Sequence, residues 1–97
     1  MPSIIYTSAY DSFRTLLKEV REDKGVTQAT LAARIGVPQS YVSKYETGER
    51  RLDFVETLEI CRALGCPSSE FTKAFETRLE RLGHKARSVV LRRRSES

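Results

Sequence analysis

Residues 27–47 decide the fold, and they read TQATLAARIGVPQSYVSKYET. Thr27 is a residue type that caps the N-terminus of a helix, and apolar residues follow it at helical spacing. Gly36 and Pro38 interrupt this pattern, because proline lacks the amide hydrogen that a helix interior needs. A second short helix is then predicted over residues 39–47. Two short helices joined by a tight turn form a helix-turn-helix unit.

One further helix is predicted before this unit. Residues 8–11, SAYD, have the spacing of an N-terminal capping motif, and apolar residues follow them at intervals of three and four. We therefore expect a helix that begins at this motif and ends near Lys24. Residues 1–8 would form an N-terminal arm, in which the apolar, β-branched run of residues 3–7, SIIYT, favours a strand-like conformation.

Two more helices are predicted after the unit. The first is capped by Asp53, and its apolar face is expected to consist of Val55, Leu58, Cys61 and Leu64. The second begins at Ser68 or Ser69 and continues to about Leu82. The sequence therefore predicts an all-α fold, with five helices over residues 9–82 and an extended fifth helix. A basic C-terminal tail, residues 83–97, follows and holds a second strand-like run, Val89-Val90-Leu91.

The composition limits the classes of protein that need considering. With 97 residues, 39% of them hydrophobic, the chain has the size of one compact domain. It has no apolar run near the roughly 20 residues that cross a bilayer and no signal-peptide pattern, so we expect a cytoplasmic protein with no membrane partner. Cys61 and Cys66 are accompanied by one histidine, His84, which excludes the common four-ligand zinc patterns. We expect two reduced thiols, no metal, no cofactor and no enzymatic site.

The net charge of +4 is unevenly distributed along the chain. Residues 25–52 hold four basic and two acidic side chains, and residues 83–97 hold five basic and one acidic. Residues 53–82, between them, hold six acidic and four basic side chains. A polyanion such as a nucleic acid could therefore meet two separate basic patches.

Polar and apolar residues of the segment 39–47 separate onto opposite faces of the predicted helix. Val42 and Tyr45, three residues apart, face inward. The outward set is Gln39, Ser40, Ser43, Lys44 and Thr47. A glutamine can form two hydrogen bonds with adenine, a serine can bond a base or a phosphate, and a lysine can reach guanine or phosphate. This face could contact base edges in the major groove of DNA, although a polar face on so short a helix is more often a solvated surface.

Several sequence elements with unbroken spacing extend the pattern over residues 16–71. They are Arg21-x3-Gly25-x-Thr27-Gln28-x2-Leu31-Ala32, Ile35-Gly36-Val37, Tyr41-Val42-Ser43-Lys44-Tyr45-Glu46-x-Gly48 and Ala63-Leu64-Gly65. Together they resemble the Cro/repressor type of helix-turn-helix domain, also called XRE-like. The resemblance implies a lambda-repressor-like five-helix domain that lays its third helix in the major groove of double-stranded DNA. It also implies a transcriptional regulator, most simply a repressor.

The same resemblance implies roles for individual residues. Gln28 would bond a phosphate and brace Gln39, the first glutamine of the reading helix. The remaining residues expected to touch bases or backbone are Ser40, Tyr41, Ser43, Lys44 and Thr47. Arg50 and Arg51 fall in a loop that tracks phosphates. A separate pair, Arg21 and Glu46, would form a structural ion pair between the first helix and the end of the third.

The predicted fifth helix continues beyond the usual end of this family's domain. We expect it to form a homodimer interface through Phe75, Leu79 and Leu82, with the two strand-like end segments pairing with each other. A two-fold axis would place the reading helices about 34 Å apart, one turn of DNA, and would match a palindromic operator. The run Arg92-Arg93-Arg94 could add phosphate contacts or reach into a minor groove as a flexible arm, although a terminal charge run is more often simply solvated.

Other circuits fit the same fold. The chain could control a restriction-modification operon, or it could be the antitoxin of a toxin-antitoxin module, with the toxin as a protein partner. An alternative of a different class is a protein-interaction module on a helix-turn-helix scaffold. Such a module would use the acidic side chains of residues 53–82 and would tolerate changes at Gln39 and Ser40.

Overall fold

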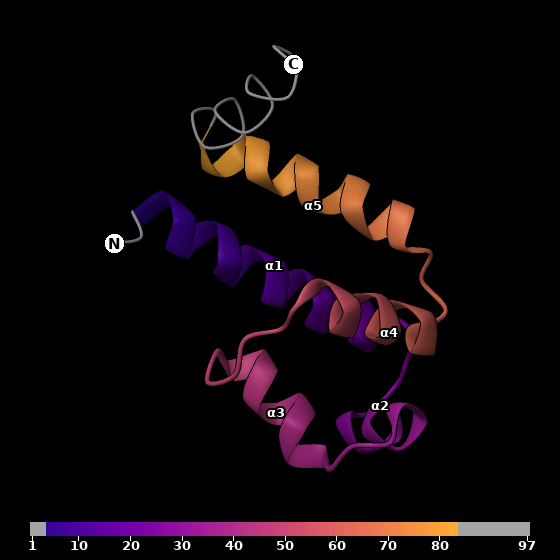
Figure 1. The fold of residues 1–97 in the computed structure, drawn as a ribbon. Coiled ribbons are helices and arrows are strands. Elements are labelled where there is room, and N and C mark those ends of the chain that lie inside the picture. The colour runs from indigo at the N-terminus through magenta and orange to yellow at the C-terminus, as the bar shows by residue number, and fades with distance from the viewer. Residues whose placement is uncertain (1–3, 84–97) are drawn as a thin grey trace.

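The computed structural model describes the backbone of residues 4–83 and the side chains of residues 8–83. This part of the chain contains five α-helices and no strand, which confirms the predicted all-α class (Figure 1). The helices are α1 (Ile4–Asp23), α2 (Gln28–Ile35), α3 (Gln39–Thr47), α4 (Phe54–Leu64) and α5 (Ser68–Leu82). Helices α1 and α5 run alongside each other in opposite directions, and α2 and α3 pack together at the other end of the molecule (Figure 1).

Local signals set the ends of the helices in the helix-turn-helix unit. The hydroxyl of Thr27 accepts a hydrogen bond from the backbone N–H of Thr30 at 3.1 Å and so caps α2. Gly36 ends α2 in the left-handed conformation, with a φ of 74°, which glycine adopts without steric cost. Pro38 then precedes the first turn of α3. The predicted unit of residues 27–47 is therefore present as two short helices and a tight turn.

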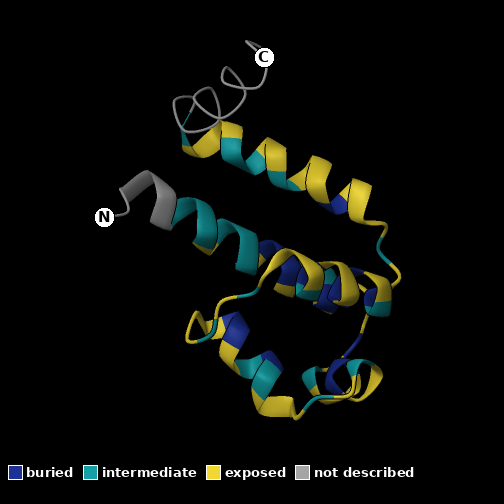
Figure 2. Cartoon of the chain, viewed as in Figure 1, coloured by how far each residue is buried: buried dark blue, intermediate teal, exposed yellow. Residues whose placement is uncertain are grey.

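A core formed by α1 to α5 fixes the orientation of α3. Val42 and Tyr45 of α3 are completely buried, together with Leu17 of α1, Leu31 of α2 and Ile60 of α4 (Figure 2). Burying aliphatic and aromatic side chains of this size stabilises the fold by roughly 1.5–3 kcal/mol each. The inward face of α3 is therefore held by packing, and its outward face is left to solvent.

The prediction for the N-terminal segment was wrong. Residues 4–7 are the first turn of α1 rather than a strand-like run, and the capping motif of residues 8–11 lies inside the helix. Strand propensity depends on neighbouring strands, whereas adding a turn to an existing helix costs little once the helix is nucleated. Asp11 instead forms an ion pair with Arg14, at 3.2 Å. The second strand-like run and the arginine run of the tail lie outside the described residues.

The prediction for the apolar face of α4 was partly wrong. Val55 is 65% exposed and Leu58 is 36% exposed. The buried face consists of Thr57, Ile60, Cys61 and Leu64. A capping box between Asp53 and Glu56 fixes where the helix begins, and the hydroxyl of Thr57 bonds the carbonyl of Asp53 at 2.8 Å, which lets a polar residue face the core.

Cys61 packs in this core as a small hydrophobic residue, as predicted. Burial raises the pKa of its thiol to about 11. The thiol therefore stays protonated at neutral pH and is a poor nucleophile.

Candidate nucleic-acid interface

The outward face of α3 presents most of the residues predicted to contact DNA. Gln39, Ser40, Lys44 and Thr47 are exposed, and Tyr41 and Ser43 are half-buried. Thr47 donates its hydroxyl hydrogen to the carbonyl of Lys44 at 3.1 Å, so this side chain lies back against its own helix. The structure therefore assembles a polar surface on a helix whose opposite side is locked in the core.

Gln28 and Gln39 are brought together across the turn between α2 and α3. The Nε2 group of Gln39 donates to Oε1 of Gln28 at 3.3 Å. Gln28 in turn donates from its own Nε2 to Oε1 of Glu46 at 2.9 Å. The first residue of α3 is thus connected to a residue near its last turn through a side chain of α2.

The ion pair expected between Arg21 and Glu46 is present and buried. Nε of Arg21 lies 2.7 Å from Oε2 of Glu46, and Nη2 lies 3.0 Å from Oε1. Nη1 of Arg21 also donates to the carbonyl of Val26 at 2.8 Å. The hydrogen bond with Glu46 holds the pKa of the Arg21 guanidinium above its ordinary value. The pair joins α1 to the end of α3, next to the polar surface.

Sequence reasoning missed a second arginine at the same place. Nη1 of Arg14 donates to the backbone carbonyl of Glu46 at 2.6 Å, and a Cβ atom on Gly48 would lie 3.1 Å from Nε of Arg14. Arg14 therefore caps the C-terminal end of α3, where helix carbonyls lack helical partners. The available signal was its spacing, because Arg14 and Arg21 are seven residues apart and share one face of α1.

The loop after α3 holds its two arginines against aromatic rings. Arg50 pairs with Glu56, with Nη2 2.8 Å from Oε2, and its guanidinium lies 4.4 Å from the centre of the Tyr41 ring. The guanidinium of Arg51 lies 4.1 Å from the centre of the Tyr10 ring. The N–H of Asp53 and the Arg50 guanidinium together lower the pKa of Glu56. Arg50 therefore also joins α3 to α4, a role that the sequence did not reveal.

A helix-turn-helix family model matches residues 17–71, more than half of the chain. The chain belongs to the XRE-like helix-turn-helix family. The matched residues include both helices of the unit, the buried ion pair and all of α4. This membership makes the protein a DNA-binding transcriptional regulator by family.

Known proteins resemble this XRE-like chain in sequence and in structure. An HTH-type transcriptional regulator of Methanothermobacter thermautotrophicus is 38% identical over 52 residues, which span 54% of this chain and 75% of that protein. The regulator y4dJ of Sinorhizobium fredii is 39% identical over 46 residues, which span 47% of this chain and 60% of that protein.

Two solved structures share the fold. An XRE-family like protein from Pseudomonas syringae has a TM-score of 0.72 and 42% sequence identity, covering 75% of this chain and 89% of its own. The clp gene regulator ClgR from Corynebacterium glutamicum has a TM-score of 0.66, with 87% of each chain covered, and at 24% identity it supports the fold alone.

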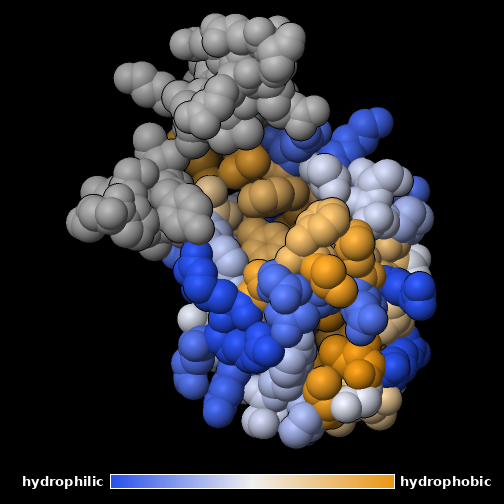
Figure 3. All heavy atoms as spheres, in the orientation of Figure 1, coloured by the Kyte–Doolittle hydropathy of each residue, from blue (hydrophilic) through white to orange (hydrophobic). Residues whose placement is uncertain are grey.

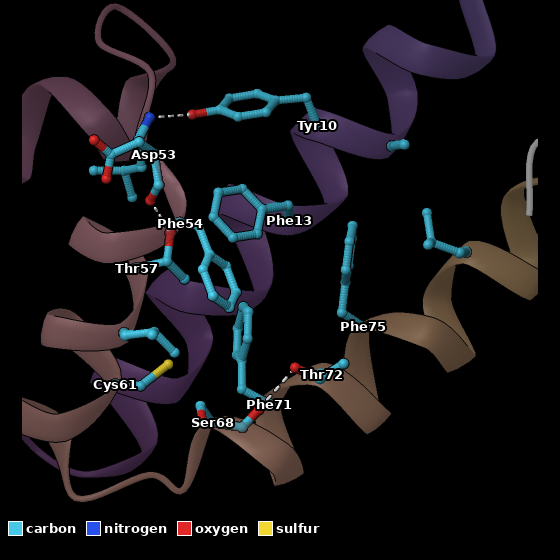
Figure 4. A pocket seen from close by; sticks show the side chains of 14 residues that line it. Tyr10, Phe13, Asp53, Phe54, Thr57, Cys61, Ser68, Phe71, Thr72 and Phe75 are labelled. Carbon is cyan, nitrogen blue, oxygen red and sulfur yellow. Dashed lines mark hydrogen bonds between the residues drawn. The ribbon is translucent and has the colours of Figure 1, made fainter. Parts of the chain in front are cut away.

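The XRE-like chain has a second surface feature, an apolar groove between α1, α4 and α5. The groove encloses about 460 Å³, and its apolar lining includes Phe13, Phe54, Leu58, Phe71, Phe75 and Leu79. Figure 4 shows four of these aromatic rings around the same space, and Figure 3 shows hydrophobic side chains gathered on this face. Phe54 is 73% exposed and was not predicted as a surface residue. No residue of α3 lines the groove, so it is separate from the polar surface.

Two of the three residues predicted for a dimer interface line this groove, and the third lies outside it. Phe75 and Leu79 line it, and the Phe75 ring also packs edge-on against Phe13 with centroids 5.8 Å apart. Leu82, 43% exposed, lies one turn beyond Leu79 near the end of α5.

Two results limit other kinds of site in the described part of the chain. Between residues 4 and 83, no helix has the length and apolar character needed to span a membrane. Over the same residues, no group of three or more histidine, cysteine and acidic side chains is arranged to hold a metal ion.

Proposed function

We propose that this chain is a transcriptional repressor that recognises a specific sequence in double-stranded DNA by laying α3 in the major groove. The observation that carries the proposal is the division of α3 into two faces. Val42 and Tyr45 are fully buried, whereas Gln39, Ser40 and Lys44 are exposed on the opposite side. A helix anchored in this way can present side chains to base edges at a fixed depth. The proposal assigns no catalysis and places the protein in the cytoplasm with the DNA.

The proposed contacts fall into two groups. Gln39, Ser40 and Lys44 would touch bases, together with Ser43 where its half-buried hydroxyl permits. Gln28, Tyr41, Thr47, Arg50 and Arg51 would touch the sugar-phosphate backbone. Backbone contacts set the position of the protein on the duplex, and base contacts supply sequence preference. Because Arg50 is already paired with Glu56, its contribution to phosphate binding is shared with an internal contact.

Selection from a pool of random duplexes tests the proposal. The purified chain is incubated with the pool at moderate ionic strength, and the retained DNA is sequenced over several rounds. Enrichment of one motif is expected. A retained pool with no sequence preference would contradict the proposed function, because phosphate contacts alone bind all duplexes similarly.

The proposed repressor binds as a homodimer to a palindromic operator. The support comes from the apolar groove, since the exposed side chains of Phe54 and Leu58 line it together, and grouped exposed apolar side chains mark interaction surfaces. Leu82, outside the groove lining, is a further exposed apolar side chain on α5. A second copy placed over this face would cover it and would leave both α3 helices free. The enriched motif is then expected to contain two inverted half-sites one helical turn apart, about 34 Å from centre to centre.

The groove also suits a protein partner, which keeps the antitoxin function as a second candidate. In that case a toxin, rather than a second copy, would cover the groove, and DNA binding through α3 would continue. Pull-down of the tagged chain from its native cells distinguishes the two. A stoichiometric second protein supports the antitoxin, and DNA without such a protein supports the homodimeric repressor.

A further inference from the structure

A chain of hydrogen bonds leads from the buried ion pair to the exposed start of α3. Arg21 donates to both carboxylate oxygens of Glu46, at 2.7 and 3.0 Å. Gln28 donates from Nε2 to Oε1 of Glu46 at 2.9 Å, and Gln39 donates from Nε2 to Oε1 of Gln28 at 3.3 Å, the longest link. Glu46 is 6% exposed and Gln39 is exposed. The four side chains therefore connect the core to the proposed reading surface.

The chemistry of Glu46 fixes the direction of every bond in this chain. A carboxylate held by a guanidinium is ionised, and an ionised carboxylate accepts hydrogen bonds without donating any. Gln28 must therefore turn its NH2 group toward Glu46, which leaves its carbonyl oxygen facing Gln39. Gln39 must in turn direct its NH2 group at that oxygen. Without such a constraint, a glutamine amide can turn by 180° at little cost, because its oxygen and nitrogen have nearly the same size.

The direction of these bonds determines what Gln39 can offer to a base. One N–H of Gln39 is used on Gln28, so Oε1 and the second N–H remain. In the major groove, adenine presents an N6 donor and an N7 acceptor, whereas guanine presents two acceptors, O6 and N7. An oxygen beside an N–H matches adenine and places an acceptor against an acceptor on guanine. In the opposite direction the amide of Gln39 is turned by 180°, so its oxygen and its N–H exchange places and set an acceptor against adenine N7 and a donor against the adenine N6 amino group.

We propose that Glu46 is a positioning residue that makes Gln39 select adenine over guanine, acting through Gln28. This inference rests on the proposed function, since it requires that α3 reads bases. It is compatible with a phosphate contact by Gln28, whose second N–H remains after the bond to Glu46. Glu46 thus has two roles, one in stability through Arg21 and one in base preference through Gln28.

The variant Glu46→Gln tests the inference. A neutral amide at position 46 has an NH2 group in place of one carboxylate oxygen, and Arg21 can only donate to it. When the amide oxygen stays on Nε of Arg21, the shorter of the two bonds, the NH2 group faces Gln28 and reverses both downstream bonds, at the cost of the bond from Nη2 of Arg21. The position read by Gln39 is first identified as the one whose preference disappears in Gln39→Ala. At that position, wild type is expected to retain adenine over guanine by about tenfold or more, the size typical of one bidentate contact. Glu46→Gln is expected to lower this ratio at least about tenfold and to leave other positions unchanged.

Two further variants separate base preference from damage to the fold. Arg21→Lys keeps a cation beside an ionised Glu46 but cannot bond both oxygens in the same plane, so it is expected to lower stability and keep the adenine preference. Gln28→Leu leaves the ion pair intact and removes the connection, so the adenine-to-guanine ratio is expected to fall toward one. If Glu46→Gln does not fold, as judged by circular dichroism, Gln28→Leu still tests the connection, because an unchanged adenine-to-guanine ratio in that variant would overturn the inference.

The outcomes distinguish this inference from the proposed function. If wild type enriches a motif, but folded Glu46→Gln and Gln28→Leu both keep its adenine preference, the positioning role is overturned and sequence reading by α3 stands. Loss of that preference in Arg21→Lys would also overturn it, because stability would then be the common cause. If wild type enriches no motif, the proposed function fails and this inference fails with it.

Discussion

Gln39 and Arg50 make different contacts within the folded chain, although both lie on or near α3. Gln39 is exposed and lies against Gln28, whereas Arg50 is paired with Glu56 and stacked on Tyr41. A glutamine in this position has hydrogen-bonding groups left for a base edge, and a guanidinium carries a charge that attracts any phosphate. Sequence preference and overall affinity should therefore depend on different residues.

Substitutions at these two positions are expected to have different signatures. Gln39→Ala should weaken binding to the selected duplex by about 1–3 kcal/mol and relax one base position. Arg50→Ala should weaken binding to all duplexes to a similar extent, because a phosphate contact carries no sequence information. Dissociation constants on the selected and a scrambled duplex, at one salt concentration, provide the measurement. Equal losses on both duplexes for both variants would contradict this division.

Two ion pairs that differ in burial are expected to differ in their contribution to stability. Glu46→Ala leaves the buried Arg21 without its partner and should cost about 3–5 kcal/mol. Glu19→Ala removes a partly exposed pair with Arg78 and should cost at most about 1 kcal/mol. Urea unfolding at neutral pH measures both free energies of unfolding. Similar values for the two variants would mean that burial of the Arg21–Glu46 pair has little energetic effect.

At the level of helices and turns, the end of α3 is fixed by Gly48 and Arg14. Gly48 has a φ of 90°, and a Cβ atom there would lie 3.1 Å from Nε of Arg14. Gly36 at the end of α2 has a similar φ of 74°, but a Cβ atom at that position would meet no atom of the described residues within 4 Å. Substitution of either glycine would therefore strain the backbone in a similar way. Only at Gly48 would the new side chain also meet a neighbouring side chain.

This difference predicts unequal effects of alanine. Gly36→Ala is expected to cost about 1–2 kcal/mol from the left-handed backbone alone. Gly48→Ala should cost about 1 kcal/mol more, because Arg14 must move and its bond to the carbonyl of Glu46 is weakened. Thermal unfolding of both variants measures the difference. If the two variants are equally stable, Arg14 does not hold the end of α3.

The start of α4 predicts a pH dependence. The N–H of Asp53 and the guanidinium of Arg50 lower the pKa of Glu56 in the folded chain, so the unfolded chain binds a proton more readily at this position. The contribution of Glu56 to stability is therefore present above the ordinary pKa of glutamate and is lost as the pH falls below about 5. In Glu56→Gln, the free energy of unfolding should fall less steeply between about pH 5 and pH 3. An unchanged slope would argue against this contribution.

The sequence predicted those elements whose ends are set by neighbouring residues. Thr27, Gly36 and Asp53 act within one turn of their own positions, and the helices that they bound were predicted correctly. The start of α1 was missed, because a short β-branched run does not reveal whether a long helix extends into it. The cap that Arg14 provides was also missed, since it joins residues 32 positions apart in the chain. Pairing of Arg50 with Glu56 depends in the same way on how α3 meets α4.

At the scale of the whole molecule, the five helices produce two separate surfaces. One surface is the polar face of α3, and the other is the apolar groove between α1, α4 and α5. The sequence predicted the first from the spacing of polar residues. It identified the second only in part, because the exposure of Phe54 depends on how α4 is rotated against the core.

Neighbouring residues of α4 allow the groove to be tested with a matched pair. Phe54 lines the groove and Val55 does not, although both are largely exposed, at 73% and 65%. Phe54→Ser is expected to weaken self-association by about tenfold or more, as loss of an aromatic contact at an interface does. Val55→Ser should leave it nearly unchanged. Analytical ultracentrifugation at tens of micromolar measures both, and a monomeric wild-type chain would remove the homodimer proposal.

The anchoring of α3 from its inner side has a consequence for how such regulators diversify. Val42, Tyr45 and the Arg21–Glu46 pair hold the helix, and the outer residues Ser40 and Lys44 take no part in that support. Those outer residues can therefore be exchanged as a set, by mutation or by grafting, to redirect the scaffold to a new target at little thermodynamic cost. Gln39 is the exception, because its partner on α2 must change along with it.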